Sequence, residues 1–295
     1  MIRDQFYRGK KLRTAAAVLL GVFILAALVL AAGRFWLISS YYNTATGYYD
    51  GAGISENVIN YSVYGVAVAA AVCGLFFMKK TEITVPLHSA AGVFGGVFCG
   101  LTVAASFVIT LIEQPFTGYG TLDILCLVLL LPAALYFILG VAVKLTYTPK
   151  VLLGFSIILW SAVNLLKLYF DLTYTINNPA KVSEQLLSIS FMLFFLYECR
   201  SIIGKGRPAV QLAVGNIAIV LSSVSVIPNV LAYFLYGYRL TVNFASQIAE
   251  LGILVYIIIR SAVTVQGISF KMPEVPAEKK AEKDEKEVKN DDSDK

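Results

Sequence analysis

Long apolar stretches, separated by short polar loops, make up most of this chain. An α-helix needs about 20 apolar residues to cross the hydrocarbon core of a bilayer, and several stretches reach that length. The alternating strands of about ten residues that build a membrane β-barrel are absent. The pattern therefore predicts an all-α, polytopic integral membrane protein, with a bundle of eight transmembrane helices in residues 1–270. The expected spans are residues 14–38, 61–78, 90–112, 122–145, 149–171, 179–203, 208–235 and 244–265.

Proline marks the expected starts of three spans and a kink in a fourth. Thr148-Pro149 and Asn178-Pro179 each have the pattern of a helix N-cap followed by proline at the first helical position. Pro208 is expected to open the seventh span in the same way. Pro132 lies in the middle of the fourth span, where it predicts a kink because it removes a backbone hydrogen bond.

The first span follows the basic segment Met1–Arg13, and this leaves two interpretations open. The arrangement resembles a cleavable secretory signal, but the apolar region of such signals usually covers only about 7–15 residues. Here the apolar run continues into Phe35-Trp36-Leu37, so we expect an uncleaved first span. The aromatic and glycine-rich segment Arg34–Asn60 is expected to be a loop at the membrane surface, with a lid over a ligand as the alternative.

The charged residues indicate an orientation rather than a nucleic-acid partner. Only 15% of residues are charged, against about a quarter in soluble domains. The net charge of +5 comes from Lys and Arg at the ends of spans, and no nucleic-acid-binding motif is present. These basic clusters fall on one side of the expected bundle. The positive-inside rule therefore predicts that both termini lie in the cytoplasm. The chain looks like the short polytopic proteins of bacterial cytoplasmic membranes, so we expect a membrane of that type, with membrane lipids around the helices.

Residues 271–295 differ from the rest of the chain in composition. They contain seven Lys and nine Asp or Glu without aromatic residues, which is typical of a segment that cannot bury a core. We expect a disordered, charged cytoplasmic tail. A docking segment for a protein partner is the alternative.

Motifs for catalysis, metals or cofactors are missing. Cys73, Cys99, Cys126 and Cys199 lie in or at the ends of apolar spans without metal-binding spacing, and His88 is the single histidine. The chain has no zinc-protease motif and no nucleophile elbow. We therefore expect no enzyme activity, no metal and no cofactor.

Polar residues inside the last four spans are the candidates for a site. They are Asn164, Lys167, Asp171, Asn229, Gln247 and Glu250. Gln247 and Glu250 share a helix face because they are three residues apart. Glu250 lies about two helical turns inside its span, so it must find a cation, a proton or water. Lys167 is the expected partner of Glu250 across a cavity between the fifth and eighth spans, whereas Glu198 and Arg200 are expected at a helix end near lipid headgroups.

Two functional classes remain open at this point. The polar residues favour a protein that binds or transports a small polar or charged solute through an outward-facing site. The alternative is a non-catalytic membrane scaffold or signalling partner that acts through helix contacts and the tail. Gly92, Gly96 and Gly100 lie four residues apart, which predicts close helix packing, within the chain rather than between copies of it.

Overall fold

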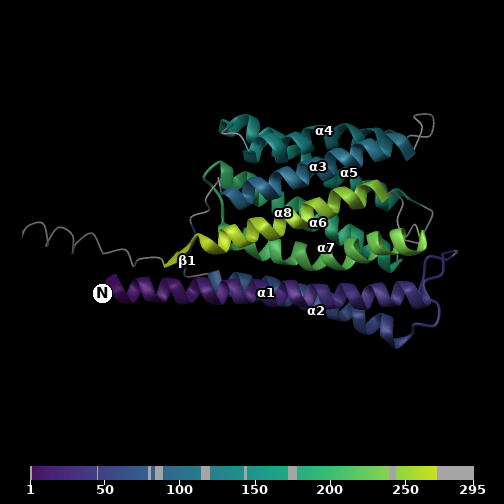
Figure 1. The fold of residues 1–295 in the computed structure, drawn as a ribbon, viewed down its shortest axis with the longest axis horizontal. Coiled ribbons are helices and arrows are strands. Elements are labelled where there is room, and N and C mark those ends of the chain that lie inside the picture. The colour runs from purple at the N-terminus through teal and green to yellow at the C-terminus, as the bar shows by residue number, and fades with distance from the viewer. Residues whose placement is uncertain are drawn as a thin grey trace, which may run out of the picture.

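The computed structural model describes residues 2–44, 46–78, 81–83, 89–113, 120–142, 145–171, 178–238 and 244–270. Its helices are α1 (Ile2–Tyr41), α2 (Ile54–Met78), α3 (Ala90–Glu113), α4 (Thr121–Ala142), α5 (Tyr147–Phe170), α6 (Pro179–Ile202), α7 (Pro208–Tyr236) and α8 (Phe244–Gln266). Each contains a segment long and apolar enough to cross a membrane. The predicted all-α bundle of eight transmembrane helices is confirmed for the described part of the chain (Figure 1). The tail, residues 271–295, lies outside the described residues.

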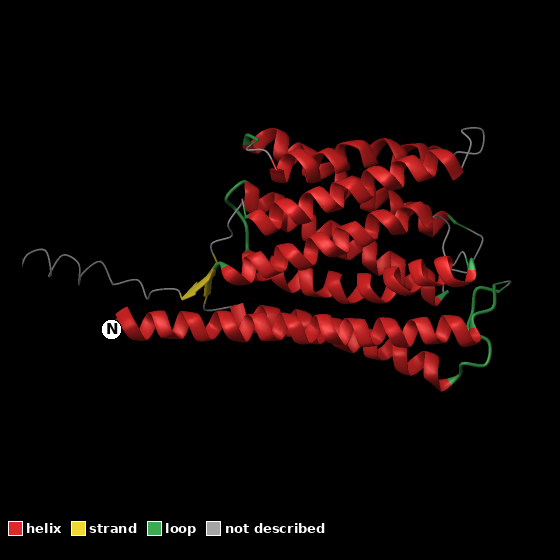
Figure 2. Ribbon diagram, viewed as in Figure 1, coloured by secondary structure: helices red, strands yellow, loops and turns green. Residues whose placement is uncertain are grey.

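A short ribbon of two strands marks one end of the bundle. β1 (Thr81–Ile83) follows α2, and it pairs antiparallel with β2 (Ile268–Phe270), which follows α8. Figure 2 shows this ribbon beside the first turns of α1. We call this the ribbon end of the bundle, and we call the end at which α6 and α8 begin the opposite end.

Six of the helices close into a ring. In chain order α3 packs against α4, α4 against α5, α5 against α6, α6 against α7 and α7 against α8, and α8 then returns to α3. α1 and α2 pack together against α7, on the outside of this helix ring. Figure 1 accordingly shows α1 and α2 along one edge of the molecule and α4 at the other. The ring gives the protein an interior in which side chains are removed from both lipid and water.

α1 shows how an almost wholly apolar helix acquires two different faces. Its buried positions recur at helical spacing, and they are largely small residues that let the helix approach its neighbours closely. They include Ala16, Leu20, Phe23, Ala27 and Ala31. Large aliphatic residues, among them Val18, Leu25 and Val29, are exposed on the other face, where lipid chains would cover them.

An aromatic layer fills the middle of the ring. Tyr136 and Phe137 of α4, Phe195 of α6 and Tyr256 of α8 are each at most 2% exposed. Phe137 lies 5.0 Å from Tyr256 and 5.7 Å from Phe195 between ring centroids, in edge-to-face geometry. Such contacts add to the burial of the ring surfaces because the ring edges and faces carry opposite partial charge. This layer separates the polar groups at the two ends of the ring.

The structure changes several of the expected helix boundaries. α1 continues to Tyr41 and α2 begins at Ile54, so Arg34 and Asn60 are helical and the loop between the helices is shorter than predicted. Arg34 donates a 2.7 Å hydrogen bond to Asn60, and its guanidinium lies 5.1 Å from the ring centroid of Tyr49. Burial raises the pKa of Tyr49, and the charge of Arg34 partly offsets that rise.

The proline signals were right at two helix starts and wrong at a third. Asn178 caps α6 by accepting from the backbone N–H groups of Ala180 and Lys181, and Pro179 is the first helical residue, as predicted. Pro208 opens α7, also as predicted. For α5, however, the N-cap is Thr146 rather than Thr148. Pro149 is tolerated inside the first turn because the N–H groups there have no intrahelical partner.

The closest helix contact of the ring lies between α3 and α8. A Cβ atom added at Gly252 would lie 1.7 Å from Oγ1 of Thr102 and 3.3 Å from the Cα atom of Cys99. Gly92, Gly96 and Gly100 are all buried inside the bundle. A Cβ atom at Gly100 would lie 2.4 Å from the side chain of Ile138 on α4. The glycines of α3 therefore serve contacts within the chain.

Replacing Gly252 by alanine should destabilise the protein, because the new methyl group forces α3 and α8 apart. We expect a loss of about 1–3 kcal/mol, the usual range for overpacking a closed core. Thermal unfolding of the purified protein in detergent measures it. Gly65→Ala is the matched control, since a Cβ atom there meets nothing within 4 Å. An equal effect of both substitutions would contradict the close α3–α8 packing.

Candidate functional site

A group of four buried polar side chains lies inside the ring near the opposite end. Asn164 comes from α5, Glu184 from α6, and Gln247 and Glu250 from α8. Each is at most 8% exposed. The Nδ2 atom of Asn164 donates to Oε1 of Glu250 at 3.4 Å, and the Nε2 atom of Gln247 donates to Oε1 of Glu184 at 3.3 Å. We call these four residues the Glu184–Glu250 site.

Helix geometry explains why these residues converge. Gln247 and Glu250 are three residues apart, so they share the face of α8 that lies inside the ring. Glu184 lies in the second turn of α6, shortly after Pro179, and Asn164 lies in the second half of α5. α5 and α6 run antiparallel in the ring, which brings the end of one helix to the level of the start of the other (Figure 1).

The charge of the site is unbalanced. Within the described chain, neither Glu184 nor Glu250 forms an ion pair with Lys or Arg. Two carboxylates close together in a low-dielectric interior cannot both carry a charge without a counter-cation. Arg34 of α1 acts electrostatically on Glu184, although its hydrogen bond goes to Asn60. One nearby cation for two carboxylates leaves a negative charge, so the site must hold a proton, a further cation or both.

The predicted pair of Lys167 with Glu250 is wrong. The Nζ atom of Lys167 lies 2.5 Å from Oδ1 of Asp123, in the first turn of α4. α5 lies between α4 and α6 in the ring, and Lys167 reaches toward α4. Asn164, one turn earlier on α5, takes the position beside Glu250 instead.

Asp171 and Asn229 lie apart from the hydrogen bonds of the site. Asp171 is the C-cap of α5, and its carbonyl oxygen accepts a hydrogen bond from the Nζ atom of Lys181. Its carboxylate is close enough to interact electrostatically with Glu184. Asn229 is buried on α7, and none of the described hydrogen bonds connects it to the site. Of the six candidates, the structure thus brings together Asn164, Gln247 and Glu250. It adds Glu184, which the sequence could have indicated because this carboxylate lies in the second turn of the sixth span.

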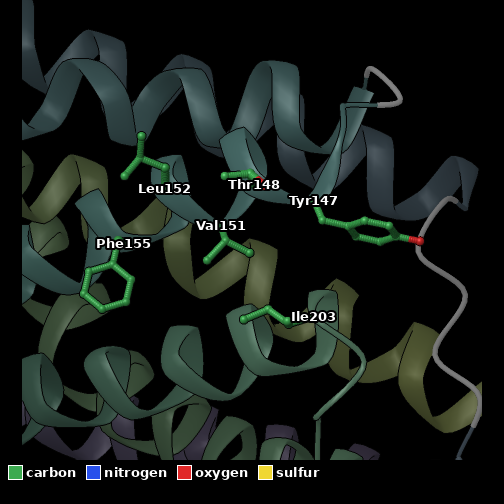
Figure 3. Close-up of a pocket in the computed structure, with 6 residues that line it drawn as sticks. All are labelled: Tyr147, Thr148, Val151, Leu152, Phe155 and Ile203. Carbon is green, nitrogen blue, oxygen red and sulfur yellow. The ribbon is translucent and has the colours of Figure 1, made fainter.

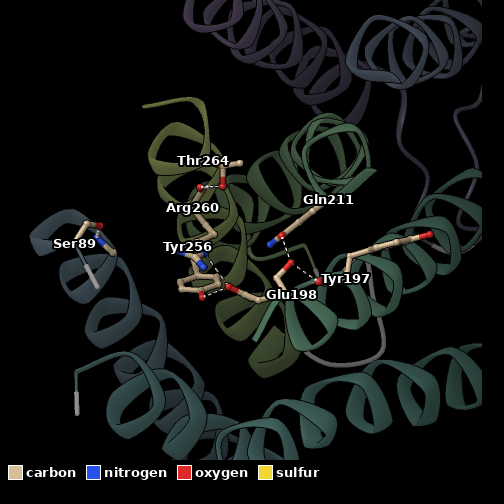
Figure 4. Close-up of polar contacts among 9 residues, drawn as sticks. Ser89, Tyr197, Glu198, Gln211, Tyr256, Arg260 and Thr264 are labelled. Carbon is tan, nitrogen blue, oxygen red and sulfur yellow. Dashed lines mark hydrogen bonds and ion pairs between the residues drawn. The ribbon is translucent and has the colours of Figure 1, made fainter. Parts of the chain in front are cut away.

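A second polar group lies at the ribbon end of the ring. Glu198 of α6 is 2% exposed, and its Oε1 atom accepts from the Nε atom of Arg260 at 2.9 Å and from the Tyr256 hydroxyl at 2.7 Å. Figure 4 shows Tyr256 and Arg260 of α8 converging on Glu198. The expectation that Glu198 lies near headgroups is therefore wrong, whereas Arg200 is exposed, with its guanidinium 5.7 Å from the ring centroid of Tyr197. The four-residue spacing of Tyr256 and Arg260 on one helix face was a sequence signal for this contact.

A larger apolar groove lies elsewhere, at the ribbon end between α5 and α6 (Figure 3). Its volume is about 350 Å³. Its lining residues are Tyr147, Thr148, Val151, Leu152, Phe155 and Ile203. Since no charged side chain lines this groove, it does not suit a charged solute.

Neither polar group has the composition of a metal centre that uses several protein ligands. No three His, Cys, Asp or Glu side chains gather closely enough to hold a metal ion within the described ranges. Searches with family models, curated proteins and solved structures found no match to this chain. The geometry of the ring interior therefore carries the functional argument.

The Glu198–Arg260 pair should be important for stability. Arg260→Met leaves the Glu198 carboxylate buried without its cation, and we expect a loss of about 3–5 kcal/mol in the free energy of unfolding. Adding Glu198→Gln to that variant should restore part of the loss, because the stranded charge is gone. Thermal or denaturant unfolding in detergent measures both variants.

The pair of Lys167 with Asp123 provides the comparison for this experiment. Its side chains are 17% and 24% exposed, so Lys167→Met should cost about 1 kcal/mol or less. If the Arg260→Met variant were as stable as Lys167→Met, Glu198 would not depend on a buried ion pair.

Proposed function

We propose that the protein is a membrane transporter of a small monovalent cation, which binds at the Glu184–Glu250 site in competition with protons. The protein acts by binding and translocation, not by catalysis. This proposal narrows the predicted small polar or charged solute to a cation.

The unbalanced charge of the site is the observation that carries the proposal. Two buried carboxylates from α6 and α8 lie inside the ring beside the amides of Asn164 and Gln247, without a described ion pair. Ionisable groups inside membrane proteins commonly mark the path of an ion or a proton. Hydrogen-bond distances join both amide–carboxylate pairs, so the four side chains pack closely, which favours a small ion over a larger organic solute.

The position of the site also supports translocation. The site lies inside the ring, on one side of the aromatic layer formed by Phe137, Phe195 and Tyr256. An ion that enters from the opposite end would meet this layer before it reached the ribbon end. Pro132 in α4 and Pro228 in α7 interrupt the backbone hydrogen bonds of two ring helices. Each helix can therefore change its bend angle at its proline during translocation.

Charge bias supports one orientation in the membrane. Among the described residues, the ribbon end carries a basic cluster of Lys150, Arg200, Lys205 and Arg207. The positive-inside rule therefore favours the cytoplasm for that end, and with it for both termini. In this orientation the Glu184–Glu250 site takes its ion from outside a bacterial-type cytoplasmic membrane.

The scaffold alternative receives less support. Gly92, Gly96 and Gly100, which were the most suitable face for a partner helix, are buried inside the bundle. A partner would have to use the remaining apolar surface, which lipid chains also fit.

Cation titration of thermal stability tests the proposal. Purified protein in detergent is titrated with Na⁺, K⁺, ammonium and methylammonium chlorides, while N-methyl-D-glucamine chloride keeps chloride and ionic strength constant. We expect one of these small cations to raise the unfolding temperature to a plateau. At a concentration of 100 times Kd the stabilisation should reach about 2.7 kcal/mol. The effect should weaken at lower pH, because protonation removes the negative charge that binds the cation.

Matched variants assign the effect to the site. Glu184→Gln and Glu250→Gln should each remove the cation response. Glu56→Gln should keep it, because Glu56 lies in the first turn of α2, outside the ring. A response that survives in Glu184→Gln and Glu250→Gln, or the lack of a response to all four cations in the unmodified protein, would contradict the proposal.

A further inference from the structure

A small enclosed cavity lies at the ribbon end of the ring, away from the Glu184–Glu250 site. Its charged lining residues are Lys150 of α5, Glu198 of α6 and Arg260 of α8. The hydroxyl-bearing side chains of Tyr136 and Tyr256 complete most of the wall. The cavity has a volume of about 10 Å³, which is roughly the space that one water-sized occupant needs. We call it the Lys150 cavity.

The charges around this cavity leave one cation in excess. Glu198 is neutralised by Arg260 at 2.9 Å and also accepts from the Tyr256 hydroxyl. Lys150 is 7% exposed, and none of the hydrogen bonds or ion pairs found among the described residues includes its ammonium group. Its charge acts on the Glu198 carboxylate, whose Oε2 atom is buried without a described hydrogen bond. The lining still carries two cations and one carboxylate. The cavity is therefore positively charged overall.

Further donors face the same space. Tyr136 is 1% exposed, and no described hydrogen bond includes its hydroxyl group. A Cβ atom at Gly140 would lie 3.4 Å from the Tyr136 ring and 3.8 Å from Cγ of Lys150, so both side chains pass over the same glycine. Gly92, in the first turn of α3, also lines the cavity, and its N–H already donates to the Ser89 hydroxyl at 3.0 Å.

We propose that the Lys150 cavity binds one small monovalent anion of the size of chloride, held by the ammonium of Lys150 and the hydroxyl of Tyr136. The excess charge of one cation matches a single negative charge. The Glu198 carboxylate in the wall disfavours anions of higher charge. The volume is that of about one water molecule, so a halide needs a small outward movement of the wall, and a phosphate or carboxylate needs a much larger one.

This site does not depend on the proposed cation function. It lies on the ribbon-end side of the aromatic layer, bordered by Tyr136 and Tyr256, and it shares no lining residue with the Glu184–Glu250 site. An anion here would stabilise the packing of α4, α5, α6 and α8 at the ribbon end. We therefore expect the stability of the protein to change with the type of anion in the buffer when the cation is kept the same.

The test titrates thermal stability with halide at constant potassium. Purified protein in potassium gluconate is titrated with potassium chloride and with potassium bromide at fixed ionic strength. We expect a saturable rise in unfolding temperature with either halide and no rise with potassium sulfate. Glu250→Gln should keep the halide response, which separates this site from the cation site. If the unfolding temperature were the same in gluconate, chloride and bromide, the cavity would hold only water and the proposal would be wrong.

Two variants and one direct observation locate the ion. Lys150→Met should lose the halide response and, in gluconate, should be at least as stable as the unmodified protein, because the unpaired charge is gone. Lys167→Met is the matched control, and it should keep the response because Lys167 pairs with Asp123 at the opposite end. Tyr136→Phe should weaken the apparent halide affinity while the ring stays packed.

Bromide provides the direct observation because its anomalous scattering identifies it in a crystal of the unmodified protein. We expect a bromide peak within hydrogen-bonding reach of the Lys150 Nζ atom and the Tyr136 hydroxyl oxygen. Bromide peaks only at the protein surface, or a halide response that Lys150→Met retains, would overturn the proposal.

Discussion

Burial of charge inside a lipid-surrounded bundle is the constraint on which this structure depends. A charged side chain in hydrocarbon must find a counter-charge, a proton or water, and only a closed arrangement of helices can supply these away from lipid. The ion pair of Glu198 with Arg260 meets this demand between α6 and α8, which are separated in the ring by α7. It joins two helices across the interior, so the ring has to close around it.

The same constraint explains how the polar groups are distributed. Buried charged side chains gather inside the ring toward its two ends, and the aromatic layer of Phe137, Phe195 and Tyr256 lies between them. One end has an excess of carboxylates, at Glu184 and Glu250, and the other has an excess cation at Lys150. The two ends are thus suited to ions of opposite sign. α1 and α2 lie outside the ring, where they cover α7 and present mostly apolar residues outward.

The sequence was sufficient to predict the number and approximate limits of the helices, because the length of an apolar run is a local property. It was also sufficient to select Asn164, Gln247 and Glu250 as buried polar residues. The partners were harder to predict. Helical periodicity tells which residues share a face, but not which helix that face meets, so Lys167 was paired with Glu250 when α4 provides Asp123. Glu198 was misplaced for a related reason, since a carboxylate near the end of a span has the same local pattern whether it faces lipid headgroups or the ring interior.

Electrical recording of ion movement most directly tests the central claim, that the carboxylates inside the ring bind and pass a small cation. Proteoliposomes on a solid-supported membrane are exposed to a step in Na⁺, K⁺ or ammonium concentration, with chloride held constant. The account predicts a transient inward positive current for the cation that stabilises the protein, and no such current for the variant that combines Glu184→Gln with Glu250→Gln. Currents of equal size in both proteins, or none in either at any of these cations, would contradict it.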